Sequence, residues 1–347
     1  MSVMTASTST AGRQRPHRPR LTRWLLRLHR PALLVWAALV VVGAALLLWL
    51  AGPVTDAAAE AWRQWHSCYR SAHCAYDQKA ILLFDDTYDY LTLALVALPF
   101  LVAAWAGGAL TGREMESGTA QLAWTQGVTP ARWLTAKLAL PAAAITAGAS
   151  LLVLLHHRAW ATAHSRTSSL DAWHGLLTFH ANGPLVVALA LTGLAAGAFA
   201  GMLLRRTLPA LAGALALTAG VWGLAWWLMP HLWPAVTRVT SFKEGYGDLY
   251  NGVEVDWGLV TSTGGHIPQP DCSASTSEEC RRLFEKLGGV GYYNTYHPSS
   301  HFWPLQLTTS AVVLAIAVLL TVAAFLVLRR LTGALRTADP ITEGAAG

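Results

Sequence analysis

Six long apolar runs divide the chain, and the stretches between them hold nearly all of its charged residues. Each run is close to the roughly 17–25 residues that a helix needs to cross the hydrocarbon core of a bilayer. None of the runs contains Asp, Glu, Lys, Arg or His. Because backbone groups in lipid must pair internally, we expect an all-α membrane protein with six spanning helices. The expected spans are 33–51, 91–110, 138–155, 184–204, 208–229 and 304–328.

The distribution of charge predicts which ends of these helices face the cytoplasm. Residues 1–30 are rich in arginine and contain no acid, Arg205 and Arg206 join spans four and five, and Arg329 and Arg330 follow span six. The stretches 52–90 and 230–303 hold more acidic than basic residues. The positive-inside rule therefore places both termini in the cytoplasm and makes 52–90, 156–183 and 230–303 outer loops.

Composition agrees with this class. The chain is 54% hydrophobic and 13% charged, with a net charge of +6, whereas soluble domains carry about 25% charged residues. The positive charge follows from the topology and attracts anionic headgroups of the lipid bilayer. Because a span follows the basic N-terminal stretch directly, we expect no nucleic-acid partner.

The N-terminal stretch 1–31 is expected to be a disordered basic tail followed by an amphipathic helix. Leu21, Trp24, Leu25 and Leu28 recur at helical spacing between basic residues, which is typical of a helix lying in the membrane interface. Pro31 is expected to turn the chain into the first span. That run is too long for the apolar region of a cleaved signal peptide, so we expect it to be retained. Residues 32–329 are expected to form the six-span domain, and 330–347 a cytoplasmic tail.

The four cysteines lie in the two large outer loops. An extracytoplasmic face permits disulfides, and the simplest pairing joins Cys68 to Cys74 and Cys272 to Cys280. Two alternatives are free thiols and a metal site in which His66 and His73 join the first pair, although that spacing matches no standard zinc pattern.

Two further features concern packing and the outer loops. Gly193, Gly197 and Gly201 put a smooth stripe on one face of span four, which favours close helix packing within the chain over a dimer interface. The long loop 230–303 is expected to be a small folded element, with a short amphipathic helix over 276–287.

The sequence lacks the motifs of several enzyme classes. It has no P-loop and no His-Glu-x-x-His, so we expect no nucleotide site, no metal centre and no enzymatic activity of its own. The histidines of 156–180 could bind a metal or could be scattered interfacial residues. Ion-coupled carriers usually keep ionisable groups inside the bilayer. Their absence from the runs indicates that, if the protein is a transporter, its energy comes from elsewhere and its substrate is apolar or amphipathic.

The stretch 113–137 between spans two and three is the most informative part of the chain. It is polar at one end and amphipathic at the other, which predicts a docking surface for a cytosolic partner. Acidic residues in its first turn complement the helix dipole. Thr129 and Pro130 predict the start of a second short helix over 131–138. Trp124 and Trp133 are expected to anchor it at headgroup level. The alternative is an interfacial helix without a partner.

Together, this layout and the run from Glu114 to Lys137 resemble the permeases of the ABC-2 transporter family. The resemblance implies a permease subunit, in a bacterial plasma membrane, that exports an amphipathic or lipophilic compound and pairs with a second copy or a paralogue. A separate ATPase subunit would bind ATP and Mg²⁺ and dock on the coupling segment, so this chain would bind no cofactor. The alternative is a non-transporting assembly or sensory factor with ligand-binding outer loops. The residues implied in docking are Glu114, Glu116, Gly118, Thr119, Trp124, Gln126, Arg132, Trp133 and Lys137.

Overall fold

The computed structural model describes residues 21–337, except for 72, 126, 169, 171, 246–251 and 274–275, and it describes side chains from 30 to 333 within these limits. The expected N-terminal tail 1–20 and the last residues, 338–347, lie outside the described part. Within it, six helical segments are long and apolar enough to cross a membrane, as the sequence predicts. Their bounds are Arg30–Cys68, Gln78–Glu116, Pro130–His164, Leu185–Leu204, Thr207–His231 and Ser299–Gly333.

The first span is part of one long helical arm. α1 (Leu21–Trp49) continues through the π-helical segment η1 (Leu50–Val54) into α2 (Thr55–Cys68). The expectation that Pro31 separates an interface helix from the span is wrong, because Pro31 lies inside α1. The arm bends at Gly52, whose backbone is not helical. The Leu50 carbonyl accepts from both the backbone amide of Thr55 and the Thr55 hydroxyl, the latter at 2.6 Å.

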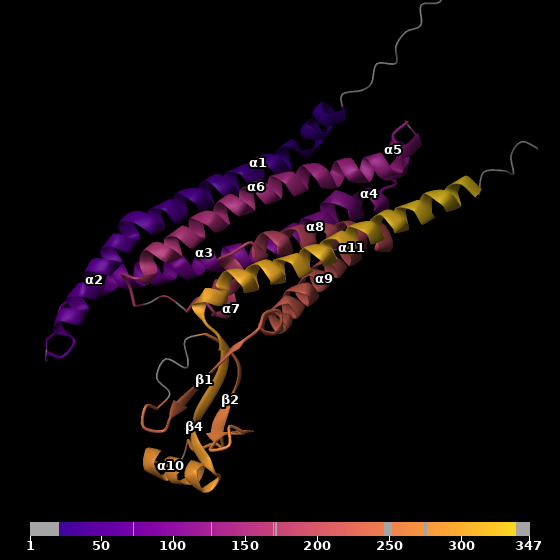
Figure 1. Ribbon diagram of the computed structural model, residues 1–347. Helices are drawn as coiled ribbons and strands as arrows, with labels where there is room; N and C mark the ends of the chain where they lie inside the picture. The colour runs from indigo at the N-terminus through magenta and orange to yellow at the C-terminus, as the bar shows by residue number, and fades with distance from the viewer. Residues whose placement is uncertain are drawn as a thin grey trace, which may run out of the picture.

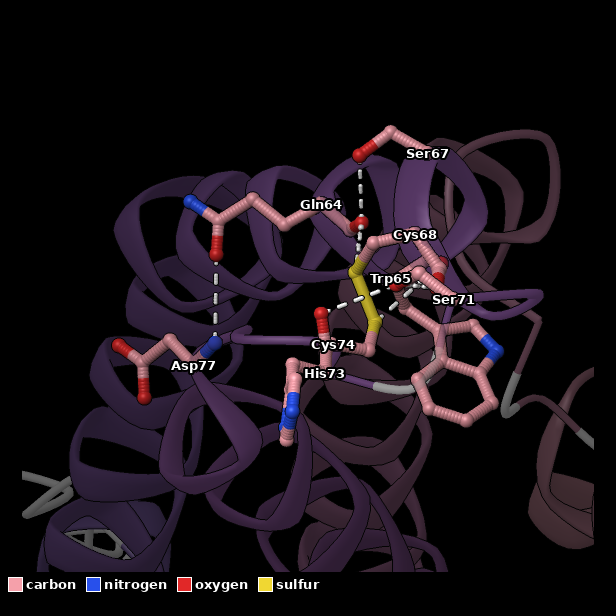
Figure 2. Close-up of a disulfide and its surroundings, with 8 residues drawn as sticks. All are labelled: Gln64, Trp65, Ser67, Cys68, Ser71, His73, Cys74 and Asp77. Atoms are coloured by element: carbon pink, nitrogen blue, oxygen red, sulfur yellow. Dashed lines mark hydrogen bonds between the residues drawn. A yellow bond between two sulfur atoms is a disulfide. The ribbon is translucent and has the colours of Figure 1, made fainter.

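The expected outer loop 52–90 is therefore mostly helix. After α2, a short turn leads to α3 (Gln78–Trp105), which the side chain of Asp77 caps by accepting from the Ala80 amide at 3.2 Å. The disulfide Cys68–Cys74 closes this turn, as predicted. Figure 2 shows that the Gln64 side chain accepts from the Asp77 amide beside it. Both cysteine sulfurs are thus used, which rules out the alternative metal site at Cys68 and Cys74.

The middle of the chain forms the core of the bundle. α3 runs through the π-helical segment η2 (Ala106–Gly112) into α4 (Arg113–Glu116), followed by α5 (Thr119–Thr125) and α6 (Pro130–His164). After α7 (Leu176–Ala181) come α8 (Leu185–Leu204) and α9 (Thr207–Leu228). Most of α8 is buried, since α3, η2, α9 and the last helix, α11 (Phe302–Thr337), surround it. By contrast, α1 packs mainly on α6, at the edge of the bundle (Figure 1).

The long connection after α9 contains a sheet that the all-α expectation does not include. The short 3₁₀ turn η3 (Met229–His231) leads to β1 (Val236–Ser241), β2 (Val253–Thr261), β3 (His266–Ile267) and β4 (Gly289–His297), which pair antiparallel in the order β1-β4-β2-β3. The expected short helix is present as α10 (Ser277–Lys286), with a capping box formed by Thr276 and Glu279. The disulfide Cys272–Cys280 ties it down. The 3₁₀ turn η5 (Ser299–His301) then leads into α11.

The two ends of the bundle differ in what they carry. α1 begins and α11 ends near α4 and α5, whereas the sheet and α10 lie beyond the opposite end (Figure 1). We refer to these as the α5 end and the sheet end.

Candidate functional site: the segment between α3 and α6

The segment 113–137 forms the tip of the α5 end. It consists of α4, α5 and the first turns of α6, joined by two tight turns. Gly118 and Gly127 have φ values of +73° and +87°, which other residues rarely adopt, and each ends a short helix. The Thr129 side chain then caps α6 by accepting from the Arg132 amide, with Pro130 at the first helical position.

This helix start is where the sequence predicts it, but the helix is not short. The expected helix 131–138 is the beginning of α6, which continues without interruption to His164. A displacement of this turn therefore acts on a helix that crosses the bundle. At the other side, α4 follows directly from η2 and α3, so both ends of the segment are stiffly joined to spans.

Glu114 and Lys137 form an ion pair inside the segment. The Lys137 side chain is 3% exposed and that of Glu114 25% exposed. The Lys137 ammonium also donates to the Leu110 carbonyl at 3.1 Å and lies 5.2 Å from the centre of the Trp133 ring. The burial of the cation is thus compensated by a carboxylate, a backbone carbonyl of η2 and an aromatic face. The pair joins the start of α4 to α6.

Glu116 joins the segment to a second span. Its carboxylate accepts from the Thr207 backbone amide at 2.8 Å and from the Thr207 hydroxyl. The interaction satisfies a free donor at the N-terminus of α9 and places negative charge at the positive end of the helix dipole. Thr207 is a functional candidate that sequence reasoning missed. The available signal is a hydroxyl residue directly after the Arg205-Arg206 turn, where a helix begins.

The two tryptophans of the segment face inward. Trp124 and Trp133 meet edge to face, with ring centres 5.7 Å apart, and Trp133 is 6% exposed. Their cluster includes Leu134, Met202 and Leu328, which come from α6, α8 and α11. The expectation that both rings anchor the segment at headgroup level is therefore wrong, because they hold it against the ends of three spans.

The outward face of the segment is formed by other residues. Leu122 is 58% exposed. Arg132, Thr119 and Gln121 are also exposed, and Gly118 is partly exposed. Gln126 lies outside the described residues. The segment therefore has one side that uses Glu114, Glu116, Trp133 and Lys137 for internal contacts, and another that is open for a partner.

The glycine stripe of α8 packs inside the chain. An added Cβ at Gly193 would lie 2.4 Å from the Pro99 carbonyl oxygen, and one at Gly197 would lie 2.6 Å from the backbone nitrogen of Gly107. At Gly201 it would lie 2.0 Å from the hydroxyl oxygen of Thr111. α8 thus lies directly against α3 and η2. This face of α8 is therefore covered within the chain and is not open to a second copy.

The histidines of 156–180 are used in packing and hydrogen bonding. His156 is fully buried, with its ring nitrogens 2.9 Å from the Thr92 hydroxyl and 3.1 Å from the Asn182 side-chain oxygen. His180 stacks on Trp222 with ring centres 4.6 Å apart. Within the described ranges, no group of three His, Cys, Asp or Glu side chains could hold a metal ion.

The comparisons with known proteins identify the family. A family model described as ABC-2 membrane transporter related matches residues 22–229, which is well over half of the chain and includes α1 to α9 and the whole segment 113–137. No curated protein matches the chain, and no solved structure does. The match, the six apolar helices and the form of the segment agree, and the chain belongs to the ABC-2 membrane transporter related family.

Proposed function

We propose that this chain is the membrane subunit of an ATP-driven exporter and that a separate cytoplasmic ATPase docks on the outward face of the segment 113–137. The observation that carries the proposal is the division of that segment into an internally bonded side and an exposed side. Leu122 would supply an apolar contact for the partner and Arg132 a charge, and arginine is enriched among binding hot spots.

The internal contacts would pass a push on this face to three helices. α4 is continuous with η2 and α3, the Glu114–Lys137 pair holds α6, and Glu116 holds the N-terminus of α9. A partner that closes on ATP binding and opens after hydrolysis would rock these helices together. Allostery of this kind needs an element joined to both sites, and the segment is such an element.

The α5 end would face the cytoplasm, since Arg205, Arg206 and the basic first turns of α1 belong to it. ATP and Mg²⁺ would bind to the ATPase, because this chain has no P-loop. A second copy or a paralogue would complete the permease in a bacterial plasma membrane. The spans carry few ionisable groups, which suits an amphipathic or lipophilic cargo.

The test is co-purification from the native membrane in mild detergent, followed by an assay of ATP hydrolysis in the eluate. Leu122→Arg and Arg132→Glu change only exposed positions of the segment. Leu287→Arg, in the turn after α10 at the sheet end, is the matched control, because Leu287 is 49% exposed.

We expect wild type and Leu287→Arg to retain an ATPase and the two segment variants to lose it or to hydrolyse ATP without stimulation by cargo. If no ATPase co-purifies with wild type even after crosslinking, the proposal is wrong. In that case the alternative of a non-transporting factor, with the sheet as its ligand-binding part, becomes the better explanation.

A further inference from the structure

An apolar slot lies between α1, α3 and α6, on the side of the bundle. Its volume is about 430 Å³, which is within the range of about 300–1,000 Å³ for small-molecule sites. Ile145 and Leu98 form its buried floor, whereas Val35 and Leu101 at its rim are 61% and 62% exposed. The slot therefore opens at the outer side surface of the helix bundle. Its walls are lined by Trp36, Leu39, Leu101, Trp105, Ala144 and Ile145.

The slot exists because α1 rests on α6 and stands off α3. Trp36 fixes this arrangement, since its indole N–H donates to the Ala144 carbonyl at 2.9 Å and its ring packs over Gly148. Apart from the indoles of Trp36 and Trp105, the lining side chains are all hydrocarbon. Whatever occupies the slot must present a mainly apolar surface, because the lining offers few polar partners.

The slot is long and open along one side. The α1 residues that line it run from Pro31 to Leu39, which is about 12 Å along a helix axis at about 1.5 Å per residue. An unbranched hydrocarbon chain can lie along a groove of this length with its surface against the apolar lining.

The mouth of the slot carries charge. Arg30 is exposed and directly precedes Pro31, the first lining residue, and Arg23 and Arg27 precede it in the same helix. Lipid tails are as apolar as leucine, so the lining by itself gives no preference over the bilayer. The shape of the slot and the charge at its mouth must therefore supply the preference for the slot over the bilayer. Basic groups beside a membrane attract anionic headgroups.

We propose that this slot is a binding site for one acyl chain of an anionic membrane lipid, drawn sideways from the leaflet at the α5 end, with its headgroup beside Arg30. The bound chain fills the space between α1 and α3 and keeps α1 in place on α6. The proposal does not depend on ATPase docking, because it concerns a different face of the bundle.

The test uses photolabelling of the full chain in phosphatidylcholine vesicles. The probes are phosphatidylglycerol and phosphatidylcholine that carry a diazirine in one acyl chain, and labelled peptides are mapped by mass spectrometry. Ala144→Phe fills the slot. Ala143→Phe is the matched control, since Ala143 is exposed on the same helix and does not line the slot. Labelling of α11, around the exposed Val318, reports that a variant is folded and inserted.

We expect phosphatidylglycerol to label α1, α3 and α6 at the slot, with a several-fold loss in Ala144→Phe and none in Ala143→Phe. Arg30→Gln should reduce the preference for the anionic probe by about fivefold, the equivalent of the roughly 1 kcal/mol that a basic residue contributes near a charged surface. Labelling that is even over all exposed helices, or that Ala144→Phe leaves unchanged, would overturn the proposal. A disulfide between two copies carrying Leu101→Cys would do so as well, because a second chain would then occupy the slot.

Discussion

Replacing Lys137 by methionine tests whether the Glu114–Lys137 pair holds the segment 113–137 to α6. Methionine keeps the length of the side chain but removes the charge, so the Glu114 carboxylate and the Leu110 carbonyl lose their donor. Removing one partner of a buried pair costs about 3–5 kcal/mol. Because a quarter of the Glu114 side chain is exposed, water can reach it, and we expect the low end, about 3 kcal/mol.

The decisive measurement is a double-mutant cycle with Glu114→Gln. The free energy of unfolding would be measured by titrating the purified protein from mild detergent into dodecyl sulfate and following tryptophan fluorescence. We expect the double variant to be more stable than the sum of the single changes predicts, by at least about 1 kcal/mol, because no lone buried charge remains. Arg132→Met removes an exposed cation from the same helix and should stay within about 0.5 kcal/mol of wild type. Single effects that add within about 0.5 kcal/mol would refute the reasoning.

Three further predictions concern packing, pH and the disulfide. Gly197→Ala should destabilise the protein by about 1–3 kcal/mol in the same titration, since the new methyl group would lie 2.6 Å from the backbone of η2. Gly220 has open space around it, so the control variant Gly220→Ala should be neutral or stabilising. Burial lowers the pKa of His180 from 6.5 to about 4. The unfolded state therefore binds the proton first as the pH drops below about 6.5, and the free energy of unfolding should fall by about 2 kcal/mol at about pH 5. His180→Gln should weaken this pH dependence, and a variant with the same pH profile as wild type would contradict the role of His180. The Cys68–Cys74 disulfide closes a short loop. A Cys68→Ser/Cys74→Ser variant should therefore lose about 2 kcal/mol of stability. Equal melting temperatures for the variant and wild type would count against a stabilising role of the disulfide.

Local sequence was sufficient for the features that depend on near neighbours. The length of each apolar run predicted the six helices, because a helix in lipid satisfies its own backbone groups. Thr129 and Pro130 predicted the start of a helix, since a cap acts over three residues. The cysteine spacing predicted two local disulfides in the same way. The boundaries were less well predicted, because amphipathic α2 and the ends of α6 continue as helices beyond the apolar part.

Tertiary structure alone decided what the polar residues of the segment contact. Sequence selected Glu114, Glu116 and Lys137 as candidates for docking, yet Glu114 pairs with Lys137 and Glu116 with Thr207, which is far along the chain. Such contacts depend on how α4, α6 and α9 converge at one end of the bundle, and no periodicity encodes that convergence. The slot between α1, α3 and α6 has the same origin, because each helix contributes an ordinary apolar stripe and only their packing leaves an apolar space between them.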